Sequence, residues 1–229
     1  MQANTNTERE KQLAAEAAAQ LVESGMTVGL GTGSTTAYVL PALAARRLEL
    51  RCVATSPATA QAALELGLNL VPFTGADAPT RLDVSIDGAD QVAPSGWLVK
   101  GGGGAHTREK AVAAATDRFV VIVSSDKLVP RLSPPIPLEL AAFGFAATLR
   151  RLEQVRLRDA PPSPDGGMIA DYLGEFEDPA ELAVRLSAVT GIVEHGLFPA
   201  TMVAEVVVGR DDHVERLTPG RGVSQLGNR

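Results

Sequence analysis

The chain has 229 residues, of which 45% are hydrophobic and 21% are charged, a composition typical of a folded globular protein rather than a disordered one. Its 21 Lys and Arg residues against 27 Asp and Glu residues give a formal net charge of −6. Because affinity for nucleic-acid phosphates is built from clustered cations, this balance argues against a general nucleic-acid binder.

The single cysteine, Cys52, excludes an intramolecular disulfide framework and a cysteine-clustered zinc site. The three histidines are isolated, so we expect no metal site. The longest uncharged run, residues 24–45, is broken by four glycines and a proline, which is unlike a membrane span. The first ten residues lack the basic start and apolar core of a signal peptide. We therefore expect a cytoplasmic protein without membrane contact.

The first segment reads as an amphipathic helix, with Thr7 and Glu10 at the spacing of a capping box and Gly25 at its end. Ser56 and Pro57 are an N-cap and a first helical residue for a later helix that Gly67 closes. A helix is also expected around residues 38–44. Strands are expected at residues 26–30, 52–55, 68–71, 82–86, 97–99 and 119–123. Apolar strands that alternate with helices indicate an α/β fold, a Rossmann-like, mostly parallel sheet covered by helices.

Four prolines within residues 130–137 mark a change of organisation. Asp178 and Pro179 begin a helix in the segment that follows. We expect a strand at 136–140, a helix at 141–153, strands at 155–159 and 168–173 around a turn at 163–167, a helix at 179–189 and a strand at 192–198. This order is that of a small ferredoxin-like α+β unit. A hairpin at 203–208 and 213–217 is expected to return to the first sheet. The predicted domains are therefore 1–129 with 203–229, and an inserted unit at 130–202.

The first loop with chemical character is Gly31-Thr32-Gly33-Ser34-Thr35, between a strand and a helix. Glycines let the backbone approach a ligand, and free N–H groups with hydroxyls suit an anion. The spacing is neither that of a nucleotide P-loop nor that of a dinucleotide fingerprint. The alternative is an ordinary tight turn with a Ser or Thr N-cap.

The second loop is Asp87-Gly88-Ala89-Asp90, directly after the strand at 82–86. Two carboxylates around a glycine can bind sugar hydroxyls, bind a cation, or act as acid and base. The alternative is a turn in which Asp87 caps the backbone.

The third loop begins at Lys100, continues through four glycines, Gly101, Gly102, Gly103 and Gly104, and reaches Glu109 in the next helix. Ordering four glycines is entropically costly, so such a run indicates a backbone that lies against something small. Lys100 and Glu109 can fold toward one pocket. The alternative, a flexible linker, is rare inside a compact α/β core.

Other residues are weaker candidates. Lys127 follows the strand at 119–123 and is a candidate for contact with an anion or substrate. His106 reads most simply as polar surface and Cys52 as a buried hydrophobe.

Together, in this order, the three loops resemble the A type of ribose-5-phosphate isomerase, and the resemblance extends along nearly the whole chain. It includes Ile136-Pro137-Leu138-Glu139 and residues 191–198. The resemblance implies interconversion of D-ribose 5-phosphate and D-ribulose 5-phosphate in the non-oxidative pentose phosphate pathway. It also implies no metal or organic cofactor, and a homodimer or higher homo-oligomer.

The resemblance also implies residue roles. By this resemblance Glu109 matches the proton-shuttling base, Lys100 and the following glycines would stabilise an enediolate, and Asp87 is a candidate for assisting ring opening. Asp87 and Asp90 bind sugar hydroxyls. The expected substrate-binding residues are Thr32, Gly33, Ser34, Thr35, Asp87, Gly88, Ala89, Asp90, Lys100, Gly101, Gly102, Gly103 and Lys127. The phosphate meets the first loop, Lys127 or an arginine from the small unit, and the residues leave this choice open.

The sequence departs from that family pattern at Gln91, where a Glu is usual, and at His106, which replaces an apolar residue. Other enzymes with a similar open sheet, namely sugar-phosphate deaminases, lactonases and acyl-CoA transferases, fit the Asp-Gly-Ala-Asp and Lys-Gly-Gly-Gly-Gly pair less well. A sugar-phosphate sensing module of a transcriptional regulator is the non-enzyme alternative.

Overall fold

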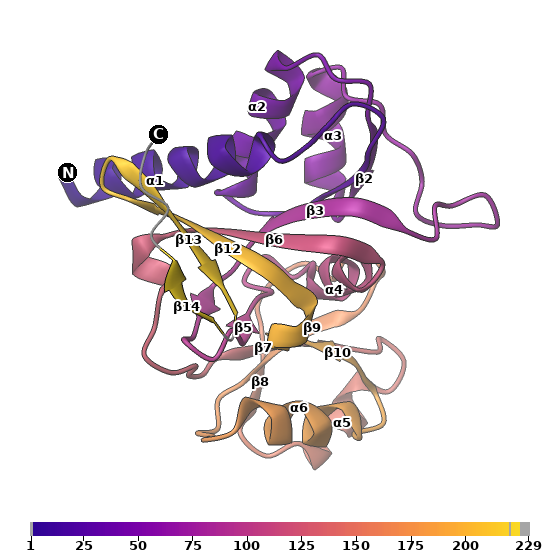
Figure 1. Ribbon diagram of the computed structural model, residues 1–229. Coiled ribbons are helices and arrows are strands. Elements are labelled where there is room, and N and C mark those ends of the chain that lie inside the picture. The colour runs from indigo at the N-terminus through magenta and orange to yellow at the C-terminus, as the bar shows by residue number, and fades with distance from the viewer. Residues whose placement is uncertain (1, 220, 225–229) are drawn as a thin grey trace.

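The computed structural model describes residues 2–219 and 221–224, and its main element is a seven-stranded sheet (Figure 1). The strand order is β14-β13-β12-β6-β3-β1-β2. The neighbours from β2 to β12 pair in parallel, whereas β13 and β14 are antiparallel. The strands are β1 (Thr27–Leu30), β2 (Arg51–Ala54), β3 (Leu82–Gly88), β6 (Thr116–Ser124), β12 (Val203–Arg210), β13 (His213–Thr218) and β14 (Arg221–Ser224). The expected mostly parallel sheet is confirmed, and the C-terminal hairpin does return to it.

Helices cover both faces of this sheet (Figure 1). The first three, α1 (Gln2–Ala19), α2 (Val39–Ala45) and α3 (Pro57–Glu65), lie on one face, and α4 (His106–Ala114) lies on the other. Alternation along β6 explains the two layers, since Val120 and Ile122 are buried against the first group while Val121 and Val123 face the opposite side. None of the helices in the described residues is long and apolar enough to cross a membrane.

The predicted start of α1 is wrong. The helix runs from Gln2, so Thr7 lies inside it and is not an N-cap. Glu10 instead reaches across to the main sheet, where its carboxylate accepts hydrogen bonds from the N–H groups of Ser125, at 2.8 Å, and Asp211, at 2.9 Å. These bonds tie α1 to the ends of β6 and β12. By contrast, the predicted caps Ser56 and Asp178 are confirmed, since each accepts a backbone hydrogen bond from the first turn of its helix.

Two expected strands of the main sheet are not part of it. Residues 68–71 form only an isolated bridge between Leu70 and Cys52. The strand expected at 97–99 is β5 (Leu98–Val99), which lies in a separate antiparallel sheet between β4 (Gln91–Val92) and β11 (Leu197–Phe198). The cause is a hairpin, in which Ala93 and Trp97 are hydrogen-bonded and the chain turns back after β4.

The segment after the proline cluster forms a four-stranded antiparallel sheet of order β10-β7-β9-β8, which is the order of a ferredoxin-like unit. Its helices pack on the face turned away from the main sheet (Figure 1). The elements are β7 (Ile136–Leu140), α5 (Phe145–Arg151), β8 (Val155–Leu157), β9 (Met168–Tyr172), α6 (Pro179–Ser187) and β10 (Ile192–His195). The helix expected at 141–153 begins only at Phe145, and the strand expected at 192–198 is divided at Gly196 into β10 and β11.

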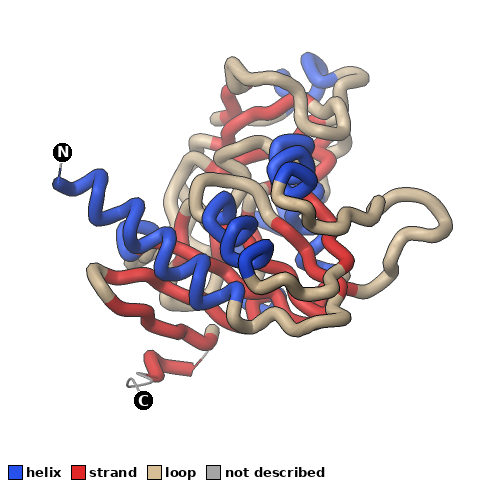
Figure 2. Tube along the Cα trace, turned by 90° about the horizontal axis from the view of Figure 1, so that it is seen from above, coloured by secondary structure: helices blue, strands red, loops and turns tan. Residues whose placement is uncertain are grey.

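Figure 2 shows the molecule from above, with both termini on one side and the loop between α3 and β3 projecting on the other. Three short 3₁₀ turns complete the described elements: η1 (Thr36–Tyr38), η2 (Ser125–Lys127) and η3 (Ala200–Met202). The expected domain boundaries remain a prediction, and residues 1, 220 and 225–229 of the larger unit lie outside the described residues.

Candidate active site

The site lies where the strand order of the main sheet reverses. The chain passes from β1 to β2 on one side and then returns to β3 on the other side of β1. In open α/β sheets, the carboxyl ends of strands at such a reversal border a ligand crevice. Here those ends carry the loop at residues 31–35 and the Asp87–Asp90 turn.

A cavity of about 150 Å³ opens at this crevice. It is lined by Thr32, Gly33, Ser34, Thr35, Thr36, Gly88, Ala89, Asp90, Lys100, Gly101, Gly102, Gly103, Glu109 and Lys127. All the expected site residues except Asp87 therefore line one cavity, and Thr36 is the lining residue that the sequence analysis missed. The third loop reaches the cavity in a way that the sequence analysis did not expect. The β4–β5 hairpin brings Lys100 back beside Asp90: the Asp90 N–H donates to the carbonyl of Val99, the residue before Lys100, at 2.8 Å.

Asp87 lies behind the cavity wall, only 4% exposed. Its Oδ1 accepts backbone hydrogen bonds from Thr32 at 3.1 Å and Gly88 at 2.7 Å, and its Oδ2 lies 3.0 Å from Lys100 Nζ. Gly31 is required here because a Cβ on it would lie 2.0 Å from the Asp87 carboxyl carbon. This geometry makes Asp87 the residue that joins the first loop to Lys100, rather than one that faces the cavity.

Lys100 is 2% exposed and lies between two carboxylates. Its Nζ donates to the Gly88 carbonyl and lies 3.1 Å from Glu109 Oε2, in addition to Asp87. Burial acts to lower the pKa of Lys100, but the charges of Asp87 and Glu109 outweigh burial and raise it. Lys100 is therefore a permanent cation at the floor of the site.

Glu109 lies on the first turns of α4, is 4% exposed and faces Lys100. Burial raises the pKa of Glu109 to about 7; the negative charges of Asp87 and Asp90 act in the same direction, and Lys100 opposes them. Its buried Oε2 pairs with Lys100 Nζ at 3.1 Å and accepts no other hydrogen bond among the described residues. A carboxylate with a pKa near neutrality can both take and return a proton.

The glycine loop lines the same cavity as the first loop. Gly102 donates its N–H to Asp90 Oδ2 at 2.8 Å, and a Cβ on Gly102 would lie 2.8 Å from that carboxylate. Gly101 has φ +104°, a conformation that only glycine adopts readily. From behind, Arg158 donates to the carbonyls of Gly101 and Gly102, a contact that the sequence analysis did not foresee.

The two departures from the expected pattern lie outside this cavity. Gln91 exchanges two hydrogen bonds with the backbone of Ser133, at 2.8 and 2.9 Å, a pairing that requires the donor of an amide. The expectation that His106 is polar surface is wrong, because the residue is fully buried. Cys52 is buried as expected, and burial raises the pKa of its thiol to about 11.

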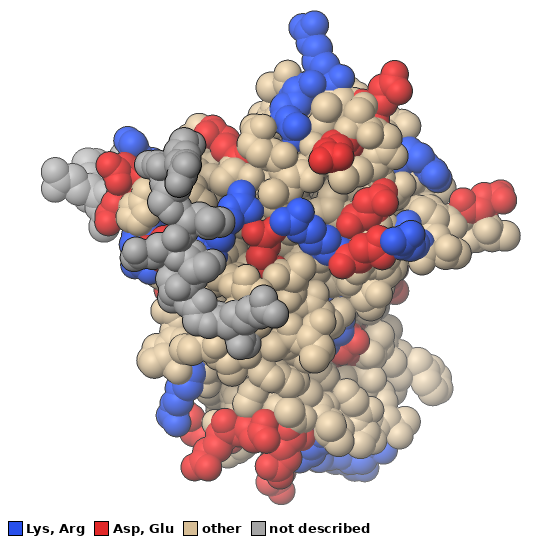
Figure 3. All heavy atoms as spheres, in the orientation of Figure 1, with Lys and Arg blue, Asp and Glu red and all other residues tan. Residues whose placement is uncertain are grey.

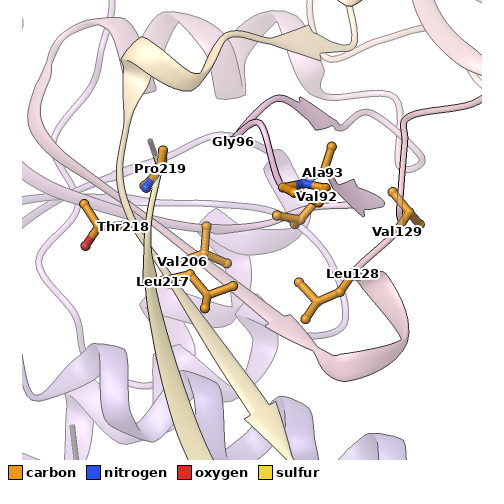
Figure 4. A pocket seen from close by; sticks show the side chains of 10 residues that line it. Val92, Ala93, Gly96, Leu128, Val129, Val206, Leu217, Thr218 and Pro219 are labelled. Carbon is orange, nitrogen blue, oxygen red and sulfur yellow. The ribbon is translucent and has the colours of Figure 1, made fainter. Parts of the chain in front are cut away.

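A second cavity, of about 260 Å³, lies between β12, β13 and the β4–β5 hairpin (Figure 4). Its lining is mostly aliphatic, and it contains no titratable side chain. It therefore has no group that transfers a proton. On the face shown in Figure 3, Lys and Arg side chains alternate with Asp and Glu instead of forming a continuous basic surface. Among the described residues, no group of three or more His, Cys, Asp and Glu side chains is arranged so that it could hold a metal ion.

Comparison with known proteins places this chain among enzymes of one family. The family model for ribose 5-phosphate isomerase A (phosphoriboisomerase A) matches residues 51–213. The ribose-5-phosphate isomerase A of Caulobacter vibrioides is 45% identical over 226 residues, which cover 92% of this chain and 98% of that protein. The chain belongs to the ribose-5-phosphate isomerase A family. It is therefore an isomerase, as the three loops imply.

Solved structures of ribose-5-phosphate isomerases have the same fold. That of ribose 5-phosphate isomerase A from Neisseria gonorrhoeae has a TM-score of 0.87 and 29% identity, covering 94% of this chain and 99% of that one. A D-ribose-5-phosphate isomerase solved in complex with phospho-erythronic acid has a TM-score of 0.85 and 31% identity, covering 93% and 99%. A second family model, for the DeoR C terminal sensor domain, matches residues 6–85.

Proposed function

We propose that the chain interconverts D-ribose 5-phosphate and D-ribulose 5-phosphate through a cis-enediol(ate), with Glu109 as the base and acid. The observation that carries this proposal is the position of Glu109. Its carboxylate is buried, has a pKa of about 7, and lies on the same cavity as Lys100, Asp90 and the glycine loop.

The reaction moves a carbonyl between C1 and C2. The ionised Glu109 takes the proton from C2 of the open-chain aldose; the electron pair forms the C1–C2 double bond, and O1 becomes negative. Glu109 then returns the proton to C1, while the proton on O2 passes to O1 and C2 becomes the carbonyl. One carboxylate that reaches both carbons serves both steps.

A sugar carbon is a weak acid, so the base alone is insufficient and the negative oxygen needs fixed positive partners. Lys100 is the permanent cation 3.1 Å from Glu109, and the N–H groups of the glycine loop border the same space. We assign charge stabilisation to these groups. Asp87 holds Lys100 in place, since its own oxygens bond the protein.

The remaining lining residues bind the rest of the substrate. Asp90 is exposed at the cavity and accepts sugar hydroxyls, while the backbone and hydroxyls of residues 32–35 with Lys127 form the cationic and polar end that suits a phosphate. The sequence also left open an arginine from the small unit for this role, and no arginine is among the residues that line the cavity.

The test is a direct assay of ribulose 5-phosphate formation from ribose 5-phosphate with EDTA present, beside glucosamine 6-phosphate. Activity that survives EDTA and is confined to the pentose phosphate supports the proposal, and phospho-erythronic acid should inhibit it competitively. Turnover that disappears with EDTA, or that occurs only with glucosamine 6-phosphate, contradicts it.

The second candidate is a sugar-phosphate sensor, favoured by the match of residues 6–85 to the DeoR sensor model. Both candidates bind a sugar phosphate in the same crevice. Saturable binding of ribose 5-phosphate without any isomerisation favours the sensor. The matched region ends before Lys100 and Glu109, the two residues to which the isomerase reaction assigns chemical roles.

We place the reaction in the non-oxidative pentose phosphate pathway of the cytoplasm, and propose that the chain assembles as a homodimer or higher homo-oligomer. Light scattering coupled to gel filtration measures the mass directly, and a monomer at assay concentration contradicts the assembly.

A further inference from the structure

Arg158, in the segment after β8, contacts the glycine loop from the small unit. Its Nη1 donates to the Gly101 carbonyl at 3.2 Å and to the Gly102 carbonyl at 2.9 Å. The same guanidinium is held by Asp171 on β9, with Nη2–Oδ1 at 2.5 Å and Nε–Oδ2 at 3.1 Å. The side chains of Arg158 and Asp171 are 21% and 9% exposed, so the pair is a largely buried, bidentate clamp.

Holding these two carbonyls also sets the direction of two N–H groups. A peptide unit is planar and trans, so its C=O and the N–H of the next residue point in opposite directions. The Gly101 carbonyl therefore fixes the Gly102 N–H, which bonds Asp90 at 2.8 Å. The Gly102 carbonyl fixes the Gly103 N–H, which has no hydrogen-bond partner in the described part of the chain, and Gly103 lines the cavity.

We propose that Arg158, oriented by Asp171, is a positioning residue that holds the Gly103 N–H toward the sugar oxygen that becomes negative. This inference rests on the proposed function. Four glycines in sequence have little conformational preference of their own, and a donor that must reorganise during the reaction stabilises charge less than a fixed one. Within the loop, the Gly104 N–H donates to the Gly101 carbonyl at 3.0 Å. The clamp adds a second hold on that carbonyl and also holds the Gly102 carbonyl.

Arg158 does not act as a direct anion ligand. Of the five N–H donors of a guanidinium, two on Nη1 face the glycine carbonyls, and Nε and one on Nη2 face Asp171. Asp171 also balances the charge. The clamp therefore predicts an effect on turnover rather than on substrate affinity.

The experiment is steady-state kinetics of Arg158→Ala with ribose 5-phosphate. We expect kcat to fall about 10- to 100-fold, as for misplacement of a catalytic group by about 1 Å, and KM to change by less than about threefold because the ground-state contacts remain. The matched control is Arg156→Ala, two residues earlier on β8; its side chain is exposed and makes no hydrogen bond or ion pair in the described part of the chain. Its kcat should stay within about twofold of the wild type.

Conservative variants and rescue distinguish positioning from a role in folding alone. Added guanidinium ion should restore part of the kcat of Arg158→Ala, whereas Arg158→Lys should remain impaired because an ammonium does not reproduce the planar fork. Asp171→Asn, which keeps the shape and loses the charge, should lower kcat less than Arg158→Ala and in the same kinetic pattern.

Each outcome decides a different proposal. A wild type without isomerase activity overturns the proposed function, and the clamp falls with it. An active wild type whose Arg158→Ala variant keeps its kcat, or changes only KM, overturns the clamp and leaves the proposed function standing. If Arg158→Ala does not fold, the kcat of Asp171→Asn is measured instead. An unchanged kcat in that variant overturns the proposal that the clamp positions the glycine loop.

Discussion

Glu109 is placed so that its proton occupancy changes near neutral pH. Burial raises its pKa to about 7, against the opposing charge of Lys100. The base must be ionised to abstract a proton, so the active fraction falls as the pH drops below that value. We predict that kcat/KM of the free enzyme falls about tenfold per pH unit below about pH 7. A profile that stays flat down to pH 5 contradicts the assignment of Glu109 as the base.

Replacing Glu109 by Gln removes the proton acceptor and keeps the shape of the side chain. General acid–base catalysis contributes about 10²–10⁴-fold, so we expect the turnover of Glu109→Gln to fall by at least that factor. Binding of ribose 5-phosphate, measured by calorimetry, should be largely preserved. Glu153→Gln is the control, because Glu153 is exposed and does not line the cavity. Near-normal turnover of Glu109→Gln contradicts the proposed mechanism.

The Lys100→Ala variant tests whether the positive charge of Lys100 stabilises the negative oxygen that forms during the reaction. Loss of one charge-stabilising donor costs about 10²–10³-fold in kcat, and we expect a much smaller rise in KM. Because Lys100 lowers the pKa of Glu109, the acidic limb of the pH profile should also move to higher pH in this variant. A rise in KM with unchanged kcat would make Lys100 a simple binding residue.

At the scale of elements, the ends of β1 and β3 approach each other so closely that only glycine fits at Gly31. A Cβ there would lie 2.0 Å from the Asp87 carboxyl carbon, whereas a Cβ on Gly88 has nothing nearer than 3.8 Å. Overpacking of this kind costs about 1–3 kcal/mol. We predict that Gly31→Ala lowers the free energy of unfolding by at least that amount in urea denaturation, and that Gly88→Ala folds with nearly wild-type stability. Equal stability of the two variants contradicts this account.

The same elements show what the sequence can and cannot predict. The strands at 82–86 and 119–123 and the caps Ser56 and Asp178 follow from local patterns, because burial periodicity and capping act over a few residues. Residues 97–99 have the same apolar pattern as a core strand, and only a long-range pairing decides that they join β11. Arg158 contacts backbone carbonyls of residues more than fifty positions away. Every residue has a backbone carbonyl, so no pattern of side chains in the sequence could have predicted this contact.

At the scale of the whole molecule, α4 lies between the main sheet and the small unit (Figure 1). Thr107 bonds Glu139 on β7, Arg108 pairs with Asp165 at 2.7 Å, and Lys110 pairs with Glu194 on β10 at 2.7 Å. The residues on either side of Glu109 are thus all anchored to the small unit. Glu109 is therefore positioned by contacts between the two sheets, not by the Rossmann-like part alone.

This packing also buries His106, beside Lys110, Glu194 and Arg158. Burial lowers the pKa of His106 from 6.5 to about 4, so the unfolded chain binds more protons between those values and His106 destabilises the fold increasingly as the pH falls. We predict that the stability advantage of His106→Leu over the wild type is larger at pH 5 than at pH 7 by about 2 kcal/mol. The raised pKa of Glu109 makes the folded state more stable as the pH falls. Glu109 is present in both the wild type and His106→Leu, so its contribution cancels in the difference between their free energies of unfolding. Chemical denaturation at the two pH values measures the difference, and a gap that stays constant or narrows on acidification means that His106 is protonated in the folded protein.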